Sequence, residues 1–63
     1  MNIGKNIQTI RQSNNLNQTD FASKLGYAQR TISGWENNAS EPSLDAIRKI
    51  KEMFNVTYEE LLD

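Results

Sequence analysis

The chain contains neither cysteine nor histidine among its 63 residues. Domains of this size bury only about 60% of the surface that the unfolded chain exposes, so disulfides, metals or a partner subunit commonly stabilise them. Without these two residue types, disulfides, thiol chemistry, zinc fingers and histidine-based catalysis or metal ligation are excluded. The fold therefore depends on a small apolar core, and we expect no metal and no other cofactor.

Charge and hydropathy identify no partner by themselves. The net charge is −1; residues 1–40 have four basic and two acidic side chains, and residues 41–63 have three basic and six acidic ones. The small basic excess of the first part would suit a polyanion, but it is equally expected by chance. No apolar run approaches the ~20 residues of a membrane span, and no signal-peptide core follows Met1. We expect a soluble cytoplasmic protein forming one domain over 1–63, with no membrane partner.

Apolar residues recur at intervals of three and four along five short segments, which predicts amphipathic helices. The first has the stripe Ile3, Ile7 and Ile10, with Asn2 as N-cap, and ends near Asn14-Asn15. The second and third span 18–25 and 29–37. No segment alternates apolar and polar residues as a half-buried strand would, so the expected fold class is all-α.

Two further helices are expected in the C-terminal part. Pro42 and Ser43 open the fourth, and Asn55 ends it. Its stripe at intervals of three and four consists of Leu44, Ile47, Ile50 and Phe54. Residues 57–60 form a capping box for the last helix, with Val56 and Leu61 as a hydrophobic staple.

The second and third segments together predict a helix-turn-helix over about 18–37. Asn17 caps the first of these helices, and Gly26 supplies a left-handed stop. Ala28, at the N-cap position of the next helix, offers no side-chain acceptor. The residues expected to pack the two helices at a steep angle are Phe21, Ala22, Leu25, Ile32 and Trp35. In this motif the second helix enters the major groove of DNA.

With Ile32 and Trp35 turned inward, the third helix presents Gln29, Arg30, Ser33 and Gly34 to the outside. Gln bonds bidentately to adenine and Arg to guanine, while serine both donates and accepts. Gly34 would allow close approach of the backbone. These residue types also suit a solvated helix face, but their connection to a packed turn favours contact with DNA bases.

A second set of residues suits DNA phosphates. Gln18 lies in the first turn of a helix, where free N–H groups attract anions. Short polar residues of the kinds that contact phosphates occur at neighbouring helix ends: Asn17, Thr19, Asn37, Asn38 and Ser40. Capping alone would explain Asn17, and capping or turn formation explains Asn38 and Ser40 at least as well.

Arg11 and Glu36 each flank a buried helix face, and an unpaired buried charge is costly. We therefore expect them to form a structural ion pair between helices. The acidic cluster of Glu59, Glu60 and Asp63 is expected to be solvated. No nucleophile set, phosphate-binding loop or carboxylate pair is present, so the sequence predicts neither an enzyme nor a small-molecule substrate.

The quoted motifs resemble the Cro/phage-repressor (Xre-type) helix-turn-helix family over essentially the whole chain. The resemblance rests on Ile10-Arg11, Leu16-Asn17-Gln18, Phe21-Ala22, Leu25-Gly26, residues 32–37 and Glu41-Pro42-Ser43-Leu44. It implies a five-helix, lambda-repressor-like domain. It also implies that Gln29 reads a base, that Gln18 contacts phosphate and braces Gln29, that Asn37 contacts phosphate, and that Arg11 pairs with Glu36.

The sequence departs from the family pattern at several helix ends. Asn15, Asn38 and Asn55 stand where glycine is common, a change that preserves left-handed geometry at modest cost. Ala28 replaces the usual Ser or Thr cap, and Lys51 replaces a small apolar residue.

The resulting hypothesis is a sequence-specific transcriptional regulator, a repressor of phage, mobile-element or bacterial type, that binds a palindromic operator as a homodimer. Candidate dimer residues are Val56, Tyr58, Leu61 and Leu62, although core packing also explains them. The alternative is a protein-interaction module of antitoxin type, which a large exposed apolar patch would favour. A purely structural bundle leaves the arrangement of Gln18, Gln29 and Arg30 unexplained.

Overall fold

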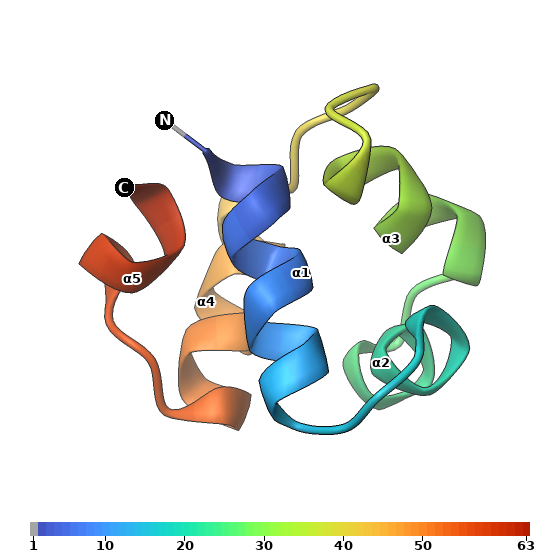
Figure 1. Ribbon diagram of the computed structural model, residues 1–63, viewed down its shortest axis with the longest axis horizontal. Coiled ribbons are helices and arrows are strands. Elements are labelled where there is room, and N and C mark those ends of the chain that lie inside the picture. Colours follow the sequence, from blue (N-terminus) through green and yellow to red (C-terminus); the bar gives the residue numbers. More distant parts are fainter. Residues whose placement is uncertain (1) are drawn as a thin grey trace.

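The computed structural model describes residues 2–63 and shows five helices joined by short turns (Figure 1). They are α1 (Ile3–Ser13), α2 (Gln18–Leu25), α3 (Gln29–Glu36), α4 (Leu44–Phe54) and α5 (Tyr58–Leu62). No strand occurs within these described residues. The all-α prediction is confirmed, and the helix boundaries agree with the sequence pattern except that α3 ends one residue earlier than expected.

Local capping explains where most helices begin. The Asn17 Oδ1 atom accepts a 2.7 Å hydrogen bond from the Asp20 amide, and the Ser43 Oγ atom accepts one of 3.1 Å from the Ala46 amide. The capping box at Thr57 is formed in both directions. Ala28 makes no side-chain cap, as expected, and neither does Asn2, although Asn2 occupies the N-cap position of α1.

Left-handed residues explain where the helices end. Gly26 has a φ of +83°, and the three asparagines at family glycine positions, Asn15, Asn38 and Asn55, have φ angles of 58°, 59° and 54°. Asparagine is the residue that best tolerates this conformation after glycine. The exchange of glycine for asparagine therefore leaves the turns intact.

The helices enclose one core, with α5 on one side of α1 and α4 and the α2–α3 pair on the other (Figure 1). The Phe21 and Phe54 rings stack with centroids 5.1 Å apart, which joins α2 to α4. The buried apolar residues come from all five helices: Ile7, Ile10, Phe21, Ala22, Leu25, Ile32, Trp35, Ala46, Ile47, Ile50 and Leu61.

Leu44 is the exception to the predicted apolar stripes, because its side chain is 82% exposed. In an α-helix each residue is rotated by about 100° from the last, so Leu44 lies roughly a quarter turn from the line through Ile47, Ile50 and Phe54. Ala46 is fully buried in α4 instead. The assignment of Leu44 to the core was wrong.

Gly4 allows α1 to approach the end of α3 closely. A Cβ atom at this position would meet the carbonyl oxygen of Trp35 and lie 2.9 Å from Oδ1 of Asn38. Neither the sequence pattern nor the family resemblance pointed to this contact. Among the described residues, no helix is long and apolar enough to span a bilayer.

We expect Gly4→Ala to lower the free energy of unfolding by about 1–3 kcal/mol, the usual cost of overpacking, because the added methyl group meets backbone that cannot rotate away. Thermal or urea unfolding measures the change. The control is Lys5→Ala, which changes an exposed residue of the same helix and is expected to change stability by less than about 0.5 kcal/mol. A Gly4→Ala variant as stable as the unaltered chain would show that α1 can move aside without cost.

Candidate nucleic-acid interface

The turn between α2 and α3 consists of Gly26, Tyr27 and Ala28 and is anchored by an aromatic contact. The Tyr27 ring meets the Trp35 ring edge to face, with centroids 5.2 Å apart, and the Lys49 Nζ atom lies 5.2 Å from the Tyr27 ring centre. The Tyr27 amide also donates to the Ala22 carbonyl at 2.9 Å. These contacts hold the start of α3 against α2 and α4, although no side chain caps it.

Arg11 and Glu36 form the predicted ion pair between α1 and α3. The Arg11 Nε atom lies 2.7 Å from Glu36 Oε2, and Nη2 donates to Oε1 at 3.0 Å, so the pair is bidentate. The two side chains are only 11% and 4% exposed. Arg11 Nη1 also donates to the Leu16 carbonyl at 2.9 Å, which ties the loop before α2 to the same group.

The hydrogen bond with Glu36 raises the pKa of Arg11 above its ordinary value, and burial opposes this only in part. A raised folded-state pKa adds stability that is lost only as the pH rises through that pKa, which here lies beyond the physiological range. The guanidinium therefore stays charged under all conditions in which the domain would act.

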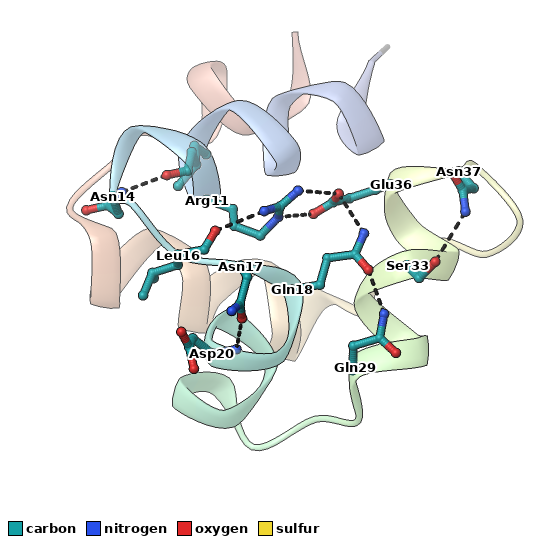
Figure 2. Close-up of polar contacts among 11 residues, drawn as sticks. Arg11, Asn14, Leu16, Asn17, Gln18, Asp20, Gln29, Ser33, Glu36 and Asn37 are labelled. Carbon is teal, nitrogen blue, oxygen red and sulfur yellow. Dashed lines mark hydrogen bonds and ion pairs between the residues drawn. The ribbon is translucent and has the colours of Figure 1, made fainter.

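The ion pair continues into a relay of amide side chains that reaches the surface of α3. Gln18 Nε2 donates to Glu36 Oε1 at 3.0 Å, and Gln29 Nε2 donates to Gln18 Oε1 at 2.6 Å. Figure 2 shows the four side chains as a continuous chain of dashed contacts from Arg11 to Gln29. We call these four residues the relay. It connects α1, α2 and α3, and its last member lies on the exposed surface.

The structure distinguishes among the four residues expected to face DNA bases. Gln29 and Arg30 are exposed, whereas Ser33 and Gly34 are half-buried. Ser33 Oγ accepts a 3.2 Å hydrogen bond from Asn37 Nδ2 (Figure 2). The absence of a side chain at Gly34 accommodates the loop after α3, because a Cβ there would lie 2.9 Å from Ser40 Oγ.

The residues expected to contact phosphates lie at two places beside the exposed part of α3. Asn17, Gln18 and Thr19 lie at the start of α2, with the Asn17 side chain used for capping and the Gln18 side chain used in the relay. The second place is the exposed end of α3 and its loop, which contains Asn37, Asn38 and Ser40. Donors at both places suit the two flanks of a groove, since backbone contacts fix the orientation of a protein on a duplex.

The spacing of the polar residues along α3 places their side chains on one side of the helix. Gln29 and Ser33 are four residues apart and therefore share one face of α3, and Asn37, directly after the helix, is bonded to Ser33. Arg30 stands beside the first of them. This face combines an amide, a guanidinium and a hydroxyl, all of which form hydrogen bonds with base edges or phosphates.

Sequence reasoning missed three parts of this arrangement: Gly4, the packing of Tyr27 between Trp35 and Lys49, and the Leu16 carbonyl as an acceptor for Arg11. A glycine in the first turn of a helix, where it costs stability, was the available signal for Gly4. The other two join residues that no periodic pattern relates. Among residues 2–63, no three acidic, histidine or cysteine side chains group into a possible metal site.

Comparison with known protein families matches residues 7–61 to the family described as helix-turn-helix. The antitoxin PezA of Streptococcus pneumoniae serotype 4 is 37% identical over 60 residues, which cover 95% of this chain and 38% of that protein. The HTH-type transcriptional activator BcrR of Enterococcus faecalis is 32% identical over 62 residues, 98% of this chain and 30% of that protein.

A third relative is the antitoxin HipB of Escherichia coli O6:H1, which is 41% identical over 44 residues, 70% of this chain and 47% of that protein. The chain thus spans about a third to a half of the length of these relatives.

We expect Glu36→Gln to lower the free energy of unfolding by about 3 kcal/mol, because it leaves the nearly buried Arg11 guanidinium without a counter-charge. Urea unfolding followed by circular dichroism measures the loss. The control is Glu52→Gln, which removes an exposed carboxylate and is expected to change stability by less than about 0.5 kcal/mol. Equal losses in the two variants would contradict a special role for the ion pair.

Proposed function

The chain belongs to the helix-turn-helix family, and from this membership we propose that it is the DNA-binding domain of a cytoplasmic transcriptional regulator, with α3 in the major groove of double-stranded DNA. The observation on which the proposal rests is the relay, which holds the exposed Gln29 at the first turn of α3. A side chain held in one orientation loses little entropy on binding and so favours a specific contact over a general one.

Gln29 and Arg30 are the proposed base-reading residues. One N–H group of Gln29 is used by Gln18, which leaves its oxygen and a second N–H for the adjacent donor and acceptor of adenine. The exposed guanidinium of Arg30 suits the two acceptors of guanine. Ser33 and Gly34 are proposed to contribute at closer approach, and the start of α2 and the loop after α3 to contact phosphates.

We propose that the regulator acts as a dimer on a palindromic operator, and that it represses by occupying the groove. With a net charge of −1, long-range attraction to DNA is weak, so two domains are needed for tight binding. The structure reduces the number of candidate dimer residues that are exposed. Leu61 is fully buried, Val56 and Leu62 pack against the core, and Tyr58 is 47% exposed, with Lys51 Nζ 5.2 Å from its ring. The surface around Tyr58 is therefore the proposed contact.

A second candidate function is that of an antitoxin, in which the principal partner is a protein. The names of PezA and HipB favour this alternative. Leu44 and Met53 are 82% and 49% exposed, but they lie nine residues apart on α4 and hence on opposite faces of the helix. They do not form one apolar patch along α4, and DNA binding remains the proposal.

We expect selection from a random duplex pool to enrich a two-fold symmetric motif. Gln29→Ala and Arg30→Ala should each cost about 1–3 kcal/mol of binding free energy and relax the preference at one base pair per half-site. Asn37→Ala is the comparison, because losing a phosphate contact should weaken binding to all sequences about equally. An unchanged motif in both the Gln29 and Arg30 variants would remove these residues from base reading.

Dimeric binding is tested on three duplexes: the full palindrome, one half-site, and the palindrome with five base pairs inserted at its centre. The insertion rotates the half-sites by about half a helical turn, so a dimer can no longer reach both from one side. We expect tight binding to the palindrome and binding of half-site strength to the other two, measured by fluorescence anisotropy. Equal affinity for all three would identify a monomeric binder.

A further inference from the structure

We propose that Glu36, acting through Gln18, determines which base Gln29 accepts, because the direction of the hydrogen bonds in the relay selects adenine over guanine. This inference rests on the proposed function, since it assumes that Gln29 meets a base edge. Glu36 and Gln18 would then be positioning residues whose chemistry decides specificity although the base is touched by Gln29 alone.

The direction of the relay is set at its buried end. A carboxylate can only accept hydrogen bonds, and both oxygens of Glu36 face donors of Arg11, at 2.7 and 3.0 Å. Gln18 must therefore turn its NH₂ group towards Glu36, which lies at 3.0 Å. The carbonyl oxygen of Gln18 is then the atom that faces Gln29.

The orientation of the Gln18 amide in turn determines that of Gln29 at the surface. Because an oxygen of Gln18 faces it at 2.6 Å, Gln29 must donate one of its two N–H groups. An acceptor oxygen and one N–H donor remain. Adenine presents a donor and an acceptor side by side in the major groove, which matches this pair, whereas guanine presents two acceptors and would oppose the Gln29 oxygen.

Reversal of the relay is disfavoured in the unaltered chain. A flipped Gln18 would place its oxygen 3.0 Å from a carboxylate oxygen, where two acceptors repel each other. The Glu36 side chain is 4% exposed, so water has little access to bridge the two atoms. The charge on Glu36 therefore fixes the orientation of two neutral amides in series.

A single substitution should reverse the direction. In Gln18→Lys the ammonium group has donors only, so it can donate to Glu36 on one side and to the oxygen of Gln29 on the other. Gln29 would then present two N–H donors, the complement of guanine. The Arg11–Glu36 pair is left in place, which separates this change from a loss of stability.

The experiment is selection from a random duplex pool with the unaltered chain and three variants. We expect the unaltered chain to prefer adenine at one base pair per half-site by roughly 5- to 150-fold, and Gln18→Lys to prefer guanine there by a similar factor. Gln18→Met neither accepts nor donates strongly and should lose the preference. Gln12→Lys adds the same charge at an exposed position of α1 outside the relay and should keep adenine.

A second measurement reads the relay without DNA. In the side-chain amide spectrum of the free protein, the two Nε2 protons of Gln29 should differ in chemical shift by more than those of the exposed Gln12, because one of them is bonded to Gln18. In Gln18→Lys this difference should fall to that of Gln12, since the oxygen of Gln29 becomes the bonded atom.

Two results overturn the inference: an unchanged adenine preference in Gln18→Lys, or no adenine preference in an unaltered chain that still enriches a motif. If the unaltered chain enriches no sequence at all, the proposed function fails instead. In that event the amide spectra still decide the direction of the relay, and an unchanged Gln29 spectrum in Gln18→Lys overturns it.

Discussion

The arrangement of α1, α2 and α3 depends on one carboxylate that is almost removed from water. Glu36 is 4% exposed, and a charge in that position is tolerated only if a partner neutralises it and hydrogen bonds satisfy its oxygens. Arg11 from α1 supplies the counter-charge and two hydrogen bonds, and Gln18 from α2 supplies a third. The end of α3 is thereby joined to both preceding helices, and the third donor group of Arg11 holds the loop between them.

The same group connects stability to the surface. In a chain of 63 residues the apolar core is small, so polar contacts between helices form a larger share of what positions them. Here those contacts do not end inside the protein, because Gln18 passes the direction of its hydrogen bond to Gln29 on the exposed face of α3. The nearly buried Arg11–Glu36 pair and the exposed Gln29, which is proposed to face DNA, are thus the two ends of the relay. Close contact at Gly4 and the packing of Tyr27 on Trp35 fix α3 at other points along its length.

Most of the fold could be predicted from local sequence, for reasons visible at particular residues. The end of α2 is set by Gly26 at a φ of +83°, and the ends of α1 and α4 by asparagines with similar geometry. Asn17, Ser43 and Thr57 cap the helices that follow them through bonds spanning three residues. The Arg11–Glu36 pair was also predicted, because each residue flanks a buried face. The error at Leu44 arose from interval counting, which does not say where the centre of a helix's buried face lies.

The sequence by itself determined the helices, their caps and turns, and the residue types on the outer face of α3, because these depend on interactions between residues a few positions apart. Only the tertiary structure decided which side-chain donors and acceptors on this face are used inside the protein, and in which orientation the side chains are held. The bond between Gln18 and Gln29 spans 11 residues and that between Gln18 and Glu36 spans 18, so both exist only after α2 and α3 have packed together. The direction of the hydrogen bonds in the relay depends on all of its members together, and it is fixed by Glu36, whose carboxylate cannot donate.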